Sequence, residues 1–275
     1  MHAHLLLAFL LLQAGGKPPE SALTAEAIMS RVAENQDKAE KLRSEYVYRQ
    51  RIHIATRKPN GKIMRDETAD YQVMPSDKGI KKQMENIFGL YRHKKQIVKF
   101  NGQPVPERDS LDGDLVSDFR SDLMNDNSKD GLGHNLFPLT SEEQKKYEFR
   151  LLGSETRNGR ELYRISFRPL DKSEIAWVGQ ALIDAEDFAP VSVFTKLSRR
   201  IPFAVRALLG TDVPDIGFNV DYRRQADGVW FPVSFGTEFR LRAVFFIKRN
   251  ITISLENSDF ERTHVESRIT SVEMN

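Results

Sequence analysis

The chain has 275 residues, of which 40% are hydrophobic, enough for a substantial core in one large domain or two smaller ones. Its 41 Lys and Arg and 39 Asp and Glu leave a formal charge of +2, so no overall electric field points to nucleic acid or to acidic substrates as partners. The chain has no cysteine, which excludes disulfides and also excludes a lipid-modified lipoprotein, because that modification needs a cysteine at the cleavage site.

The first residues have the pattern of a secretory signal peptide. An apolar run over residues 1–12 is too short to span a bilayer comfortably, and small residues follow it at 14–16. The run begins with histidines and has no Lys or Arg, and an uncleaved anchor would look similar. We expect residues 1–16 to be a signal peptide, 17–23 to be a linker, and 24–275 to form a single domain exported to the periplasm.

A helix with one apolar side is predicted after Thr24, whose side chain is suited to cap it. Its apolar residues recur at helical spacing: Ile28, Met29, Val32, Ala39 and Leu42. Such a stripe is usually core packing, so we expect the helix to lie on a sheet. A partner-binding face is the alternative.

Two strands are predicted next, over residues 44–56 and 67–74, with a turn signal at 59–61 between them. The first strand alternates between an apolar and a more polar face. The apolar face carries Tyr46, Tyr48, Ile52 and Ile54, and the other face carries Val47, Arg49, Arg51 and His53.

Residues 81–100 give a mixed signal that includes a basic run at 92–95. We expect this run in a solvated strand face or a turn; a site for phosphate or a lipid head group is the alternative, since clustered cations hold anions. After Ser110 a short amphipathic helix is predicted from Leu115, Val116, Phe119, Leu123 and Met124, and a loop follows over 125–134. The aspartates in and after this helix do not follow the ligand order of an EF-hand, so we expect them to be solvated: Asp112, Asp114, Asp118, Asp122 and Asp126.

From residue 147 onward the sequence predicts a meander of antiparallel strands. Two of them, 147–156 and 160–169, flank the hairpin signal Asn158-Gly159, and others are expected at 176–184, 191–195 and 216–222. The next strand is expected to have an apolar face of Phe231, Val233, Phe235, Phe239 and Leu241. Its other face carries Ser234, Glu238, Arg240 and Arg242. A sheet with one apolar face must cover it with protein or with a ligand.

A segment at 197–210 interrupts this meander where a tight turn would have sufficed. Its apolar residues are Ile201, Phe203, Val205, Leu208 and Leu209, and its basic residues are Arg199, Arg200 and Arg206. An insert of this kind is suited to plug the core, to act as a lid over a cavity, or to touch an anionic membrane surface.

The sequence contains no recognisable catalytic or metal-binding motif: no Gly-x-Ser-x-Gly, no phosphate loop and no His-Glu-x-x-His. No pair among its six histidines has ligand spacing, so no metal and no other cofactor is expected. Asp184, Glu186 and Asp187 are close enough in sequence for acid–base chemistry, but Asp in a turn more often caps its own backbone. We predict that the chain is not an enzyme; a hydrolase using Asp184 or His264 is the rival hypothesis.

Several motifs together resemble a known family: Phe167-Arg-Pro169, the stretch from Gly179 to Val191, Gly228-Val-Trp-Phe-Pro232 and Asn257-Ser-Asp-Phe260. With the first helix and the Tyr46-Val-Tyr48 strand, they resemble the periplasmic lipoprotein carrier (LolA/LolB-like) superfamily over about Thr24 to Phe260. The resemblance implies a mainly β (α+β) fold: a curved antiparallel sheet, or half-open β-barrel, of about eleven strands enclosing a few helices and an apolar cavity for acyl chains. The chain departs from the short carriers in its length and in residues 197–215.

Together with the signal peptide and the missing catalytic motifs, the resemblance leads to the hypothesis of an exported, non-enzymatic and monomeric protein that holds lipid, or the acyl chains of a lipoprotein, and carries it across the periplasm. The predicted cavity-lining residues are Tyr46, Tyr48, Phe203, Leu208, Phe231, Phe235 and Phe239. Peripheral membrane contact is expected through Arg199, Arg200 and Arg206, and no contact with nucleic acid is expected. The alternative is an envelope protein-interaction or sensor module with a closed core, because aromatic residues inside a sheet usually serve to fill it.

Overall fold

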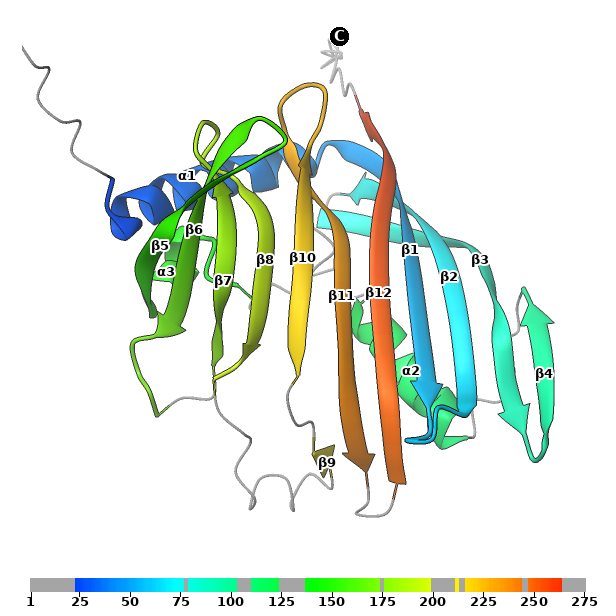
Figure 1. Ribbon diagram of the computed structural model, residues 1–275. Coiled ribbons are helices and arrows are strands. Elements are labelled where there is room, and N and C mark those ends of the chain that lie inside the picture. The colour runs from blue at the N-terminus through cyan, green and yellow to red at the C-terminus, as the bar shows by residue number, and fades with distance from the viewer. Residues whose placement is uncertain are drawn as a thin grey trace, which may run out of the picture.

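The computed structural model describes residues 23–76, 79–102, 110–123, 137–173, 176–198, 211–212, 216–243 and 247–263. These residues form one twelve-stranded antiparallel sheet and three helices (Figure 1). The helices are α1 (Ala25–Arg43), α2 (Leu111–Leu123) and α3 (Ser141–Gln144). The strands are β1 (Tyr46–Arg57), β2 (Ile63–Ser76), β3 (Gly79–His93), β4 (Gln96–Asn101), β5 (Tyr147–Arg157), β6 (Arg160–Pro169), β7 (Trp177–Asp184), β8 (Pro190–Leu197), β9 (Thr211–Asp212), β10 (Gly217–Arg224), β11 (Trp230–Ala243) and β12 (Ile247–Arg262).

The sheet is curved and is not closed into a ring. Its strand order is β4-β3-β2-β1-β12-β11-β10-β8-β7-β6-β5, and the short β9 pairs with β11 beside this path. The last strand pairs with the first, β12 with β1, which joins the two halves of the chain. β4 and β5 end the path at opposite edges. The predicted curved antiparallel sheet of about eleven strands is confirmed.

Glycine permits close approach of strands at two positions in this curved sheet. A Cβ at Gly89 of β3 would lie 2.2 Å from the backbone oxygen of Asp66, and one at Gly179 of β7 would lie 1.9 Å from the backbone oxygen of Phe194. No side chain fits at such distances, so neighbouring backbones approach more closely here than any other residue would allow.

The helix α1 lies across one end of the inner side of the sheet, the side on which all three helices are found (Figure 1). Thr24 caps it, because its Oγ1 accepts a hydrogen bond from the backbone N–H of Ala27 at 3.2 Å. Its buried residues Ile28, Met29 and Val32 belong to the main core. The predicted cap and the predicted core role of the apolar stripe are confirmed.

The predicted hairpin turn between β5 and β6 is present. Asn158 and Gly159 have φ values of 52° and 79°, as the hairpin between β5 and β6 requires. The basic run at 92–95 begins in β3, which ends at His93, and continues into the turn to β4, where Lys94 has a φ of 54°. The run is therefore divided between the two structures expected for it, a strand and a turn.

The expected apolar face of β11 is interrupted at Val233. The pairing passes from Asp221 opposite Ser234 directly to Tyr222 opposite Pro232, so Val233 is an extra residue in a β-bulge. A bulge breaks the alternation of side chains, and Val233 consequently lines a cleft on the outer side of the sheet. The prediction that Val233 shares the apolar face was wrong for this reason.

Several predictions fall on residues outside the described ranges. They concern the signal peptide at 1–16, the loop at 125–134, and the insert containing Arg199, Arg200, Phe203, Arg206 and Leu208. No helix in the described part of the chain is long and apolar enough to cross a membrane.

Candidate ligand-binding site

Five of the predicted cavity-lining residues lie in the described ranges, and all five are buried. Tyr46, Tyr48 and Phe231 come together in one small cluster. Its other members are Val73, Ile80 and Val229, with Leu42 and Phe260 packed against it. The ring centroids of Tyr46 and Phe231 are 4.7 Å apart.

The other two lie in the main core. Phe235 stacks on Phe218 with a centroid distance of 5.2 Å, and Phe239 meets Phe119 of α2 edge to face at 5.9 Å. The structure thus divides the predicted lining between two places, and in both places the rings pack against protein.

The Tyr46 hydroxyl is fixed at the end of the small cluster by a hydrogen bond to the carboxylate of Asp227. Burial is the largest effect on this hydroxyl, and together with the bond to Asp227 it raises the pKa of Tyr46 well above its usual value. The hydroxyl therefore stays protonated and serves as a donor. Tyr46 is held in place by this contact, which the sequence did not indicate.

The helix α2 covers part of the inner side over β1 and β2 (Figure 1). Val116 is fully buried beneath it, and Phe119 packs against Phe239 of β11. The apolar side of α2 therefore rests on an apolar wall of the sheet, as the spacing of these residues predicts.

The beginning of α2 is anchored by a buried carboxylate. Asp112 Oδ1 accepts hydrogen bonds from Thr56 Oγ1 at 2.8 Å and Arg249 Nε at 2.6 Å, and its Oδ2 accepts one from Arg249 Nη2 at 2.8 Å. Only 7% of Asp112 is exposed. The expectation that Asp112 is solvated was wrong, because its partners come from β1 and β12 and no local spacing reveals them.

The middle and the end of α2 have their own polar anchors. Arg120 donates to Glu67, and Glu67 also accepts from Arg65 Nη2 at 2.8 Å, all three side chains being nearly inaccessible to solvent. Burial, and then the charge of Arg65, lower the pKa of Arg120. At the last turn, Lys82 Nζ donates to the backbone oxygen of Leu123 at 2.7 Å, a favourable place for a cation.

These anchors orient α2 but contribute little to its net stability on the sheet. Taking two charges out of water costs about as much as their attraction returns, so a buried ion pair is often no better than apolar packing of the same volume. The remaining attraction comes from apolar side chains such as the fully buried Val116 and the partly buried Phe119, at up to about 2 kcal/mol each.

A row of polar residues crosses the inner side of the sheet within this apolar wall. Gln50 of β1 is paired with Tyr71 of β2 on one side and with Asn257 of β12 on the other. Gln50 Nε2 donates to Asn257 Oδ1 at 3.0 Å, and Asn257 Nδ2 donates to the backbone oxygen of Pro232 at 3.0 Å. Gln50 Oε1 and Tyr71 Oη are buried and make no hydrogen bond with any described residue.

One feature of the sequence indicates this polar row: a glutamine on the apolar face of the first strand. The alternation of Tyr46, Tyr48, Ile52 and Ile54 leaves position 50 on the same apolar face, and that position is a glutamine. A polar residue at an apolar position of a strand is the informative exception to such a pattern. Its partners on β2 and β12 depend on the strand pairing.

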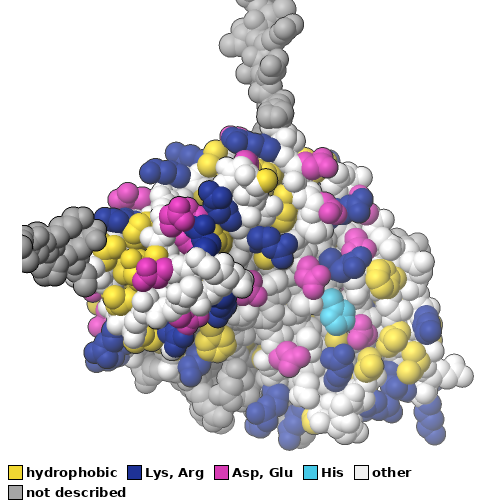
Figure 2. All heavy atoms as spheres, turned by 45° about the horizontal axis from the view of Figure 1, so that its top comes forward, with side chains coloured by type: hydrophobic (Ala, Val, Ile, Leu, Met, Phe, Trp, Pro, Cys, Tyr) yellow, Lys and Arg dark blue, Asp and Glu magenta, His cyan; other side chains and the backbone are white. Residues whose placement is uncertain are grey.

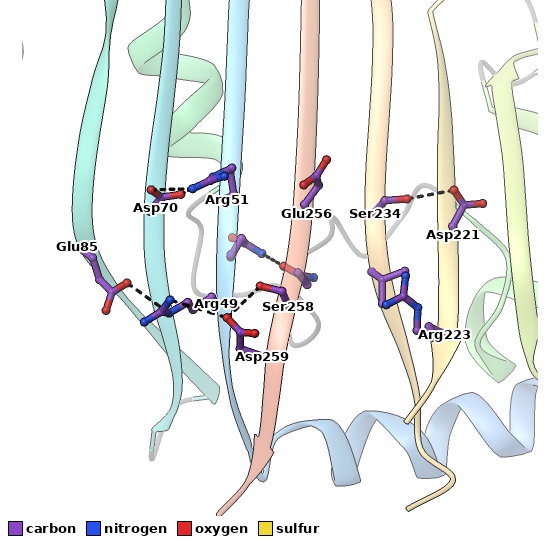
Figure 3. Close-up of a pocket in the computed structure, with 13 residues that line it drawn as sticks. Arg49, Arg51, Asp70, Glu85, Asp221, Arg223, Ser234, Glu256, Ser258 and Asp259 are labelled. Atoms are coloured by element: carbon purple, nitrogen blue, oxygen red, sulfur yellow. Dashed lines mark hydrogen bonds and ion pairs between the residues drawn. The ribbon is translucent and has the colours of Figure 1, made fainter. Parts of the chain in front are cut away.

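An outer cleft of about 620 Å³ lies on the opposite side of the sheet from the helices (Figure 3). It spans β3 to β10, and Figure 3 shows Arg51 beside Asp70 and Ser234 beside Asp221, at 2.7 and 3.0 Å. Its charged lining residues are Arg49, Arg51, Arg223, Asp70, Glu85, Asp221, Glu256 and Asp259. The two signs are mixed, as they are over the face in Figure 2, so the cleft favours no ligand of one charge.

A second outer cleft, of about 690 Å³, lies over β2, β3 and β4. Phe88 lines it and is 37% exposed, and Ile97 on the same hairpin is 52% exposed. Together with the turn cations Lys94 and Lys95, these residues form an apolar and basic edge. The alternative of an anion site at this turn stays a prediction.

The carboxylates considered for acid–base chemistry fasten a turn. Asp184 Oδ1 accepts from the backbone N–H groups of Glu186 and Asp187 at 3.0 and 2.9 Å, and from Arg160 Nη2 at 2.7 Å. Asp187 Oδ2 accepts from the indole N–H of Trp230 at 3.0 Å. The interpretation of Asp184 as a turn cap is confirmed.

In the part of the chain that the structure describes, no group of three histidine or carboxylate side chains is arranged to hold a metal ion. His53 lies on the outer side of β1, with its Nε2 2.9 Å from Asp66 Oδ1. The pKa of Asp66 is lowered mainly by this hydrogen bond.

No family model and no curated protein matches the chain. Among solved structures it is similar to a LolA superfamily protein from Nitrosomonas europaea, with 13% identity over 89% of this chain and 96% of that one, and a TM-score of 0.33. It is also similar to an outer membrane lipoprotein-sorting protein domain from Vibrio parahaemolyticus, with 13% identity, coverage of 88% and 95%, and a TM-score of 0.38.

A DUF1329 family protein from Desulfovibrio piger is similar at 10% identity, with coverage of 87% and 93% and a TM-score of 0.35. Sequence identities of 10–13% concern the fold alone, and TM-scores below 0.5 carry no argument about activity. The structures that resemble the chain thus include LolA superfamily, lipoprotein-sorting and DUF1329 proteins.

Proposed function

We propose that the chain is an exported, non-catalytic binding protein that holds an acyl chain, from a lipid or an acylated lipoprotein, against the inner side of the sheet beneath α2. The observation that supports this proposal is the way α2 packs on the inner side of the sheet. An apolar wall that includes Phe239 is covered by a short helix whose fixed anchors are buried ion pairs. Such a cover is suited to exchange with an apolar guest.

The energies involved are of similar size. Among the apolar side chains of α2 that pack on the core, Val116 is fully buried and Phe119 is partly buried, and these two contribute at most roughly 4 kcal/mol in total. An acyl chain gains about 0.8 kcal/mol per buried methylene, so a dozen methylenes yield on the order of several kcal/mol after ordering costs. A guest of this length therefore competes with the helix for the wall, and binding stays reversible.

Export and transport complete the proposal. The apolar run at 1–12 and the small residues after it favour a signal peptide and a periplasmic location. The 275 residues contain no cysteine that could carry a lipid modification, which suits a carrier that moves between membranes. Peripheral contact through Arg199, Arg200 and Arg206 belongs to the same proposal.

A thiol-labelling experiment tests the exchange, because the chain has no cysteine of its own. Val116→Cys places the thiol under α2, where the native side chain is fully buried. Oleic acid is expected to speed its reaction with a maleimide by about tenfold or more, since the site opens when α2 lifts. Val193→Cys, equally buried in β8, is the matched control and is expected to stay protected.

The closed-core interaction or sensor module is the second candidate. Favouring it, all five described lining residues are at most 8% exposed and pack on protein. Its signature would be Val116→Cys protected at every oleate concentration, together with native mass spectra that show only the mass of the protein. Acceleration of both thiols would instead indicate unfolding by the fatty acid.

A further inference from the structure

The inner wall contains two buried polar atoms that pair with none of the described residues, on directly opposed residues of neighbouring strands. We propose that Gln50 Oε1 and Tyr71 Oη form a binding site for a secondary amide, such as the N-acyl linkage of an acylated ligand. This inference rests on the proposed function and specifies which acyl ligands the site prefers.

The two residues lie on one face and close together. Gln50 and Tyr71 are register partners on β1 and β2, and opposed side chains of an antiparallel pair have Cβ atoms about 5 Å apart. Each is 1% exposed. Gln50 lies two residues from the buried Ile52 on β1, and Tyr71 lies two residues from the buried Ala69 on β2. Residues two apart on a strand share a face, so both belong to the inner side.

The orientation of the Gln50 amide follows from its neighbours. The Pro232 backbone oxygen can only accept a hydrogen bond, so the Asn257 side chain must place its Nδ2 donor there. The Asn257 Oδ1 atom consequently faces Gln50. Asn257 Oδ1 in turn requires the Nε2 donor of Gln50. The free end of Gln50 is therefore an acceptor, Oε1, and a flipped amide would place two acceptors against each other.

An unpaired polar atom in a protein interior is unfavourable and rare. Its burial without a partner costs about 1–3 kcal/mol, whereas an apolar side chain of the same shape would cost nothing of the kind. Here two such atoms occur on one register pair, on the inner side of the sheet. A partner that arrives with the ligand accounts for both of them.

The chemistry of the two atoms selects a neutral group with a donor and an acceptor. Burial raises the pKa of Tyr71, so its hydroxyl remains protonated and donates to a carbonyl oxygen. Gln50 Oε1 accepts from an N–H. A secondary amide offers both groups; an ester lacks the donor, and a carboxylate would place a buried negative charge next to Oε1.

The first test compares three ligands with the same chain: N-methylpalmitamide, methyl palmitate and palmitate, titrated by calorimetry. The amide is expected to bind about tenfold more tightly than the ester, which is the effect of leaving one buried acceptor unpaired. Tyr71→Phe and Gln50→Met are each expected to reduce this ratio toward one. Tyr163→Phe on β6, the matched control, is expected to leave the ratio unchanged.

The second test needs no ligand. If Tyr71 Oη is unpaired, Tyr71→Phe removes an unfavourable group, and the thermal midpoint of the free protein stays the same or rises. A fall in the midpoint would mean that a buried water already pairs the hydroxyl, and it would overturn the inference. Equal affinity for amide and ester would overturn the inference alone, and failure of all three ligands to bind would overturn the proposed function with it.

Discussion

Asp184 is completely buried, yet it is charged, and several hydrogen-bond donors surround its carboxylate. Burial, the largest effect, raises its pKa, but the hydrogen bonds from Arg160 and from the backbone N–H groups of Asp187 and Glu186 outweigh it. The pKa of Asp184 therefore lies below its ordinary value of 3.8. A carboxylate with a lowered pKa stabilises the fold at neutral pH and loses that contribution as the pH falls through its folded pKa.

Asp184→Asn is expected to lower the free energy of unfolding by about 2 kcal/mol at pH 7, because the charged hydrogen bonds to Arg160 are weakened. The difference from the wild type is expected to shrink as the pH falls below 3.8, since the wild-type group is then protonated as well. Urea unfolding across pH 7 to 3 measures it. Glu186→Gln is the control, since this side chain is 81% exposed, and a comparable loss there would contradict the assignment.

At the residue scale, the sequence identified which side chains are buried more readily than it identified their partners. Tyr46 and Phe239 were correctly expected on the inner side. The bond of Tyr46 to Asp227 and the anchoring of Asp112 by Arg249 join residues 181 and 137 positions apart, so no local pattern encodes them.

At the scale of elements, α2 depends on its polar anchors for its position. Asp112→Ala leaves the Arg249 guanidinium buried without its carboxylate, and is expected to cost about 3 kcal/mol of unfolding free energy. The pair Asp112→Leu with Arg249→Met is expected to restore most of that loss, because it removes both charges together. Chemical denaturation of these variants, and of the Asp112→Leu and Arg249→Met single variants, completes the double-mutant cycle.

Asp118→Ala is the matched control for this cycle, because Asp118 is an exposed aspartate on the same helix. Its effect is expected to stay within about 0.5 kcal/mol. A double variant as unstable as Asp112→Ala would show that the ion pair itself, and not the unpaired charge, determines stability.

Structural elements could be predicted where a few adjacent residues define them. They could not be predicted where the pairing of strands defines them. The Thr24 cap and the Asn158-Gly159 turn were both read from a few adjacent residues. The short helix α3 was missed although Thr140 and Glu143 form a capping box, a signal present in the sequence. The bulge at Val233 leaves no such signal, because it arises from the register of β11 against β10.

At the scale of the whole molecule, the close approach of strands at Gly179 is required for the sheet. Gly179→Ala would place a Cβ 1.9 Å from the Phe194 oxygen and 2.8 Å from the ring of Phe167, and is expected to cost about 3 kcal/mol or more. Gly236→Ala is the control, since nothing lies within 4 Å of its Cβ position. Thermal unfolding compares them, and equal stability of the two variants would contradict the role of Gly179.

The candidate site shows the same limit over longer distances. The apolar wall was predictable from the alternation along each strand. The row from Tyr71 through Gln50 to Asn257 was not, because it lies on three strands whose order in the sheet, β2-β1-β12, differs from their order along the chain. Which polar atoms meet is decided only when the last strand pairs with the first.

The edge strands β4 and β5 do not pair with each other, which affects the size of ligand that the sheet can hold. In a closed barrel, strand number and stagger set the girth. This sheet has no such closure condition. The width that it encloses can therefore change through small changes of twist spread over many strands, while the hydrogen bonds between the strands are kept. The same wall can therefore accommodate guests of unequal bulk without a change of fold.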